Sequence, residues 1–121
     1  MKGKLLRDAA HGDIELGPLE IELIDTPEFQ RLRGIKQLGT AYLVYPSATH
    51  TRFEHSLGSS WMARKMIEAL RRTGPISADE ETAIRVAALL HDITHIPFGH
   101  TLEDERRVLP RHDKDEARFV Y

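Results

Sequence analysis

Residues 87–100 read AALLHDITHIPFGH, and the rest of the chain can be interpreted from this stretch outward. An apolar run ends abruptly in adjacent histidine and aspartate, His91 and Asp92, and two further histidines follow before residue 101. Burial of the apolar run carries these polar side chains inward, where they are unfavourable unless they are paired or bind a metal. An adjacent histidine and aspartate at the inner end of an apolar helix therefore predict a candidate metal site.

The helix that carries this run has clear start and stop signals. Ser77 followed by Glu80 is a capping box, which predicts that the helix begins there. Pro97 prevents the helix from continuing far past Asp92. Helical spacing predicts a buried face made of Ile84, Ala87, Ala88 and His91.

A second helix is predicted over residues 51–72. Phe53, Leu57 and Trp61 recur at steps of four, and the apolar pattern continues through Met62, Met66, Ile67 and Leu70. The helix ends at Thr73-Gly74-Pro75, because glycine and then proline is a common helix stop.

The first forty residues predict smaller elements. Alternation in Asp13-Ile14-Glu15-Leu16 favours a short strand or hairpin within residues 4–16, followed by a short helix near residues 19–24. Thr26-Pro27-Glu28 predicts the start of another helix, which carries Phe29, Leu32 and Ile35 on one apolar face and extends to Leu38. Short helical patterns are also expected over residues 101–108 and 113–121. The fold class is mainly α.

The composition describes one soluble globular domain over residues 1–121. The 121 residues are 40% hydrophobic and 30% charged, with a net charge of −2, so no global basic field indicates nucleic acid as the main partner. The chain contains no cysteine, which excludes disulfides and thiolate chemistry and fits a cytoplasmic location. No segment approaches the roughly 20 apolar residues of a membrane span, and no signal peptide precedes the domain.

A third candidate ligand is His55, on the helix predicted over residues 51–72. By itself, its position favours a core histidine bonded to a backbone carbonyl over a metal ligand. Together with His91 and Asp92 it forms a mixed nitrogen and oxygen set that suits Mn, Fe, Zn or Ni. Residues 91–95, HDITH, also resemble the zincin motif, but aspartate is shorter than its glutamate and Pro97 stops the helix, which disfavours a metalloprotease.

The arrangement of several motifs resembles the HD-domain metal phosphohydrolases, and more closely their deoxynucleoside triphosphate triphosphohydrolase branch. The motifs that carry this resemblance lie at residues 11–12 (HG), 25–32 (DTPEFQRL), 35–39 (IKQLG), 46–50 (PSATH), 52–58 (RFEHSLG) and 89–100 (LLHDITHIPFGH). The resemblance implies an HD-domain helical bundle with a short N-terminal β-hairpin. It also implies hydrolysis of nucleoside triphosphates, with a deoxynucleoside and triphosphate as products.

The resemblance assigns roles residue by residue. It implies that His55, His91 and Asp92 bind a divalent metal, which could be Mn, Fe, Mg, Zn or Ni. It places His95, Glu103 and His112 in the catalytic set, with Glu103 orienting His112 for proton transfer. It implies phosphate binding by Arg52 and sugar contacts by Gln37 and Leu38. The residues alone also allow structural roles without catalysis. His95 could cap a helix, Glu103 and His112 could be solvated surface side chains, and Arg52 could be an exposed arginine.

The pattern departs from this family in two ways. The family completes its metal site with a later aspartate, and no suitable one occurs here, so we expect a truncated HD domain without its C-terminal helices. Thr94 and Ile96 also stand where the family usually has glycine. The hypothesis is a metal-dependent phosphohydrolase that acts on a nucleotide and could form homo-oligomers. The alternative is a catalytically inactive, nucleotide-binding regulatory module or a fragment.

Overall fold

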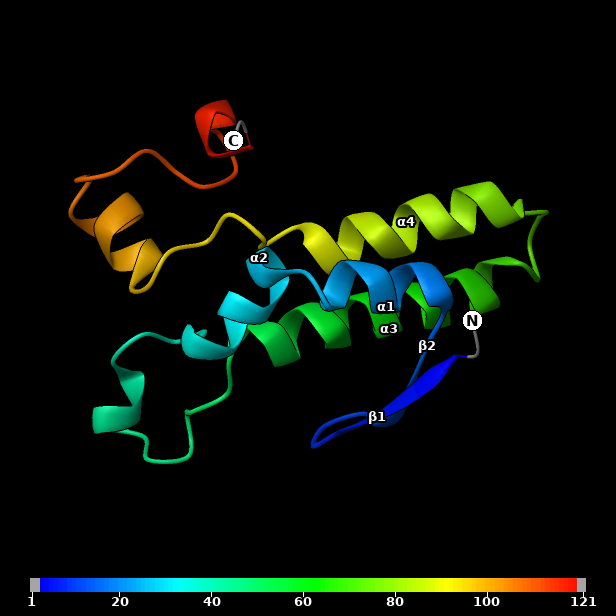
Figure 1. The fold of residues 1–121 in the computed structure, drawn as a ribbon, viewed down its shortest axis with the longest axis horizontal. Coiled ribbons are helices and arrows are strands. Elements are labelled where there is room, and N and C mark those ends of the chain that lie inside the picture. Colours follow the sequence, from blue (N-terminus) through cyan, green and yellow to red (C-terminus); the bar gives the residue numbers. More distant parts are fainter. Residues whose placement is uncertain (1–2, 120–121) are drawn as a thin grey trace.

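Two antiparallel helices form the centre of the fold (Figure 1). The computed structural model describes residues 3–119. Helix α3 spans Arg52–Leu70 and α4 spans Ala78–Leu90. Helix α4 begins at the predicted capping box, Ser77 with Glu80, and α3 begins at a capping box that sequence analysis did not single out, Thr51 with Glu54. The two helices make the most extensive contact between elements, and the start of α3 lies beside the end of α4. The sequence prediction of these two helices is confirmed.

The N-terminal segment covers one side of this helical hairpin. Strands β1 (Lys4–Asp8) and β2 (Gly12–Leu16) form the predicted antiparallel hairpin, and α1 (Pro18–Ile24) lies in front of α3 in Figure 1. The fold is therefore mainly α with one short hairpin. A single apolar core joins these elements and consists of Ile14, Leu16, Ile21, Ile24, Phe29, Leu32, Ile35, Phe53, Leu57 and Leu89.

The helix predicted from Thr26 to Leu38 is shorter than expected. Helix α2 covers only Pro27–Gln30 and continues as the 3-10 turn η1, Arg31–Gly34. Ile35 is extended, its carbonyl accepts a 2.8 Å hydrogen bond from the Arg52 amide, and the next residue forms a bridge with Thr51. Pairing with the start of α3 thus replaces continued helix, although Phe29, Leu32 and Ile35 are buried as predicted.

The predicted buried face of α4 is partly wrong. Ile84 and Ala87 are exposed, His91 lies at the rim, and Leu89 is the fully buried residue of α4. The reason is that α1, α2 and η1 cover only one side of the helical hairpin. On α3, Ile67 is buried, but three apolar residues of the same pattern are exposed, Met62, Met66 and Leu70.

A buried polar cluster ties α1 to both long helices. Oε2 of Glu20 accepts hydrogen bonds from Arg85 (2.5 Å) and from the Gly17 amide (2.7 Å). Oε1 of Glu20 accepts a 3.1 Å bond from the Ser60 hydroxyl, which also lies 3.1 Å from the Arg85 carbonyl. Glu20 is 5% exposed, so this carboxylate is taken from water and fully paired inside the fold.

The remaining elements are short turns. They are the 3-10 turn η2 (Ala41–Leu43), the π-turn η3 (Thr101–Glu105) and the 3-10 turn η4 (Glu116–Phe119). The helical patterns predicted over residues 101–108 and 113–121 are therefore much shorter in the structure, and residues 120–121 lie outside the described part. Within residues 3–119, the helices are too short or too polar to cross a lipid bilayer.

Candidate metal centre

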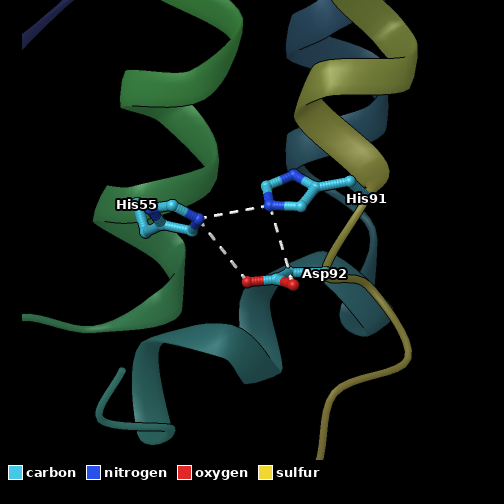
Figure 2. A group of neighbouring side chains, drawn as sticks. All are labelled: His55, His91 and Asp92. Atoms are coloured by element: carbon cyan, nitrogen blue, oxygen red, sulfur yellow. Dashed lines mark hydrogen bonds and ion pairs between the residues drawn. The ribbon is translucent and has the colours of Figure 1, made fainter. Parts of the chain in front are cut away.

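Three side chains converge where α3 begins and α4 ends (Figure 2). His55 lies one turn into α3, His91 is the C-cap of α4, and Asp92 is the next residue. The Nε2 atoms of His55 and His91 are 3.2 Å apart. Oδ2 of Asp92 lies 3.7 Å from Nε2 of His55, and Oδ1 lies 3.6 Å from Nε2 of His91. The helical hairpin thus gathers residues that are 36 positions apart in the sequence.

This group has the chemistry of a metal site. The three ligand atoms lie within 4.8 Å of one another, and ligands at about 2.0–2.2 Å from one ion are themselves separated by about 3 Å or slightly more. Nδ1 of His91 is 2.8 Å from the Ala88 carbonyl, so it donates there and leaves a lone pair on Nε2. Two imidazoles and one carboxylate therefore fit a divalent cation and leave positions open for further ligands.

Partial burial changes the pKa of His55, the candidate ligand on α3. Partial burial lowers the pKa of His55 below its ordinary value, against the opposing attraction of the Asp92 carboxylate. The imidazole is therefore neutral at pH 7, and neutral imidazole is the form that binds metals. His55 also borders a cavity of about 400 Å³ between the hairpin turn at residues 8–11 and α3.

Asp92 is held by Arg52, which the sequence left open as a phosphate ligand or an exposed side chain. Arg52 is only 4% exposed, and its Nη1 donates a 2.6 Å hydrogen bond to Oδ2 of Asp92. Burial raises the pKa of Asp92, but nearby His91 and Arg52 outweigh this effect and hold the pKa below its ordinary value. The carboxylate is therefore ionised and oriented without a metal.

The sugar-contact candidates lie at different distances from this cluster. Nη2 of Arg52 donates to the Gln37 carbonyl at 3.4 Å, so the Gln37 backbone borders the centre. Leu38 is 52% exposed in the turn that follows. The structure therefore brings Gln37 close through its backbone and places the Leu38 side chain at the surface.

His95 lies next to Asp92 in the fold and is completely buried. Nδ1 of His95 is 3.2 Å from the Ile96 carbonyl, while Nε2 is buried without a hydrogen-bond partner among the described residues. Burial lowers the pKa of His95 to about 4, so the ring is neutral at pH 7. The ring packs against that of His112, with centroids 4.1 Å apart.

Glu103 and His112 form a buried pair beside His95. Nδ1 of His112 donates a 2.9 Å hydrogen bond to Oε2 of Glu103, and Nε2 of His112 lies 3.6 Å from Oδ1 of Asp92. Burial alone would raise the pKa of Glu103, but hydrogen bonds from His112 and Arg118 lower it to about 2. The carboxylate is therefore ionised, and the His112 ring has one nitrogen fixed and the other directed toward the metal ligand.

Two arginines that sequence analysis did not single out support this centre. Arg31 donates to the carbonyls of His95 (2.8 Å) and Ile93 (2.5 Å), which holds the loop after α4. Arg118 donates a 2.9 Å hydrogen bond to Oε1 of Glu103. Neither contact has a local signal, because the partners lie 62–64 and 15 residues away in the sequence.

The chain is similar to several known proteins. An uncharacterized protein of Methanocaldococcus jannaschii is 59% identical over 100 residues, which cover 83% of this chain and 21% of that protein. Deoxynucleoside triphosphate triphosphohydrolase SAMHD1 of Homo sapiens is 48% identical over 103 residues, which cover 83% of this chain and 16% of that protein. The same enzyme of Danio rerio is 47% identical, with 83% and 17% covered. The chain thus spans about a fifth or less of the length of these relatives.

The family model for the HD domain matches residues 52–121, from the first residue of α3 onward. This match contains His55, His91 and Asp92, the three residues of the candidate metal centre. Because it covers more than half of the 121 residues, the chain belongs to the HD domain family.

Proposed function

We propose that this chain is the metal-binding part of a phosphohydrolase that cleaves (deoxy)nucleoside triphosphates or a related nucleotide. One observation carries the proposal: the His55, His91 and Asp92 cluster lies directly beside the buried Glu103–His112 pair. Similarity to the triphosphohydrolases named above supports a nucleotide as the substrate class.

His55, His91 and Asp92 would hold a divalent cation, whose identity among Mn, Fe, Mg, Zn and Ni is open. Such an ion, when bound, polarises a phosphoryl oxygen and lowers the pKa of a bound water. Arg52 keeps the Asp92 carboxylate ionised and oriented before the ion binds. The protein therefore provides a preformed ligand set, although a further ligand from protein or water is needed to complete the coordination.

Residues around the cluster would act on the phosphates. Nδ1 of the neutral His95 ring donates to the Ile96 carbonyl, so its buried Nε2, which lacks a partner among the described residues, would accept a hydrogen bond from a water bound beside the phosphates. The positive charge of Arg52, beside Asp92, would stabilise the negative charge that develops on the phosphate during cleavage. His112 would transfer the proton at the scissile P–O bond through Nε2, because Glu103 holds its other nitrogen.

The nucleoside would lie on the side of His55 that borders a cavity. The cavity of about 400 Å³ beside His55 is within the range of small-molecule sites and could hold part of a nucleotide. Gln37 and Leu38 would contact the sugar from the other side of Arg52. The products would be a deoxynucleoside and triphosphate. A single domain, a cytoplasmic location and assembly into homo-oligomers complete this proposal.

Metal content and hydrolysis test the proposed function together. Purified protein should contain or take up one divalent ion per site and release triphosphate from a deoxynucleoside triphosphate. His91→Ala should abolish both, and its exposed position makes a folding defect a minor concern. Asp79→Asn, at the opposite end of α4, is the matched control and should retain both.

Nucleotide binding without turnover under any divalent metal would contradict the proposal. It would favour instead a non-catalytic, nucleotide-binding regulatory module with the same fold. Full hydrolysis by His91→Ala would contradict both the metal assignment and the mechanism. Calorimetry for binding and phosphate release for turnover separate these outcomes.

A further inference from the structure

Glu103 is the most deeply buried carboxylate near the metal centre, and each of its oxygens has a different partner. Its side chain has no exposed surface. Oε2 accepts a hydrogen bond from Nδ1 of His112, and Oε1 accepts one from Nη1 of Arg118, both at 2.9 Å. An ionised carboxylate this deeply buried is unfavourable unless cations or donors satisfy both oxygens. Arg118 therefore satisfies Oε1 of Glu103, as His112 satisfies Oε2.

Arg118 is itself fixed by the segment that carries His112. Its Nη2 donates to the Pro110 carbonyl at 2.6 Å, and its Nε donates to Asp115 at 3.2 Å. Residues 106–115 contain no helix or strand in the described structure. Backbone hydrogen bonds to Thr101 and Leu102 hold the first part of this segment, and the side chain of Arg118 contacts the part around His112. The Arg118 guanidinium joins both flanks of His112 to Glu103. A planar guanidinium with five donors is suited to such a three-way contact.

We propose that Arg118 is a positioning residue: it fixes the Glu103 carboxylate so that Glu103 holds His112 with Nε2 directed at the metal centre. This inference rests on the proposed function, in which His112 transfers a proton. Arg118 does not contact the reacting atoms and acts through Glu103. Without the guanidinium, Oε1 of Glu103 would lack its cation. The carboxylate would then rotate toward water, or the proton between Glu103 and Nδ1 of His112 would be distributed differently.

Steady-state kinetics of the full chain test this role. Arg118→Gln should lower kcat by roughly 10- to 100-fold, as expected for a misplaced acid–base group, while KM changes less than about twofold. Arg118→Lys should retain part of the activity, and added guanidinium should restore part of the loss in Arg118→Gln. Arg111→Gln is the matched control, because Arg111 pairs with Asp104 and Asp113 at the surface of the same segment. An equal loss in Arg111→Gln, or a change in KM alone, would overturn the proposal.

A second measurement does not depend on catalysis. Nitrogen-15 NMR of the His112 ring at pH 8 should show the proton on Nδ1 in the wild-type protein and in Arg111→Gln. Arg118→Gln should show a mixture of the two tautomers and a broader signal. An unchanged tautomer in Arg118→Gln would overturn the positioning role. If the wild-type protein failed to hydrolyse any nucleotide, the proposed function would fail while this measurement still decided the role of Arg118.

Discussion

The middle of the α3–α4 hairpin and its near end, where α3 begins and α4 ends, each bury a carboxylate beside an arginine, but they do so differently. In the middle, both oxygens of Glu20 accept hydrogen bonds, from Arg85, Ser60 and the Gly17 amide. At the near end, Oδ2 of Asp92 binds Arg52, whereas Oδ1 faces the imidazoles of His91 and His112 at 3.6 Å, beyond hydrogen-bonding distance.

This difference separates a structural ion pair from a candidate binding site. A buried carboxylate with donors on both oxygens has no oxygen left for a ligand, and its role is to fix how elements pack. A buried carboxylate with one oxygen directed at two histidine nitrogens can still bind a cation. Nε2 of the neighbouring His95 is also buried without a partner among the described residues.

The largest expected effect comes from Arg52→Ala. In metal-free protein this substitution leaves the buried Asp92 carboxylate without its cation and should lower the free energy of unfolding by roughly 3–5 kcal/mol. Saturating Mn²⁺ should reduce that loss, because the ion binds the same carboxylate. Urea denaturation with chelator and with Mn²⁺ measures both values. An identical loss under the two conditions would argue against a cation site at Asp92.

The corresponding substitution in the middle of the hairpin is Arg85→Ala. The loss should be smaller, roughly 2–3 kcal/mol, because the Arg85 side chain is 18% exposed and water can partly replace it. Mn²⁺ should leave this loss unchanged, since Glu20 is not part of the His55, His91 and Asp92 cluster. Lys65→Ala, which removes an exposed pair with Glu68, is the control and should leave stability nearly unchanged. Metal-dependent rescue of Arg85→Ala would remove the distinction between the two carboxylates.

His95 makes the near end sensitive to pH. Its pKa is about 4 in the folded protein, against an ordinary value of 6.5 for histidine in an unfolded chain, so the unfolded chain binds more protons between these values. This stabilisation is present above pH 6.5 and is lost as the pH falls toward 4, by roughly 2–3 kcal/mol in total. His95→Gln should remove this part of the pH dependence in metal-free urea denaturation between about pH 7 and 4.5. Parallel curves for the two proteins would contradict the pKa assignment.

The smallest effect is expected for Gly99→Ala. A Cβ at Gly99 would overlap the imidazole of His95, so the substitution should displace that ring and destabilise the fold by about 1–3 kcal/mol. Gly34→Ala is the control, because a Cβ there meets no atom within 4 Å. Denaturation gives the stability, and the His95 NMR signal reports the ring. An unshifted His95 signal would show that the ring does not depend on the space at Gly99.

Sequence predicts the parts of this molecule that local chemistry determines. The capping box Ser77–Glu80 predicts where α4 begins, the apolar pattern from Phe53 predicts α3, and the HD-type motif predicts which residues form the His55, His91 and Asp92 cluster. Tertiary contacts decide the rest. Ile35 leaves the predicted helix because its carbonyl pairs with the start of α3.

Burial and long-range pairing were harder to predict for the same reason. The apolar spacing of α4 suggested that His91 is buried, but only one side of the helical hairpin is covered by the described residues, and His91 lies at the rim. The contact between Arg118 and Glu103 joins the short turns η4 and η3, and no periodicity or motif encodes such a pairing.

The capping of the two long helices also gives the centre a built-in electric polarity. The amino terminus of α3 begins at Thr51, and the carboxyl terminus of α4 ends at His91, so opposite ends of two helix dipoles lie close together. The α3 end carries roughly half a positive charge and favours anions, and the α4 end carries roughly half a negative charge and favours cations. The backbone alone thus separates a side suited to phosphate from a side suited to a metal ion, before any side chain contributes.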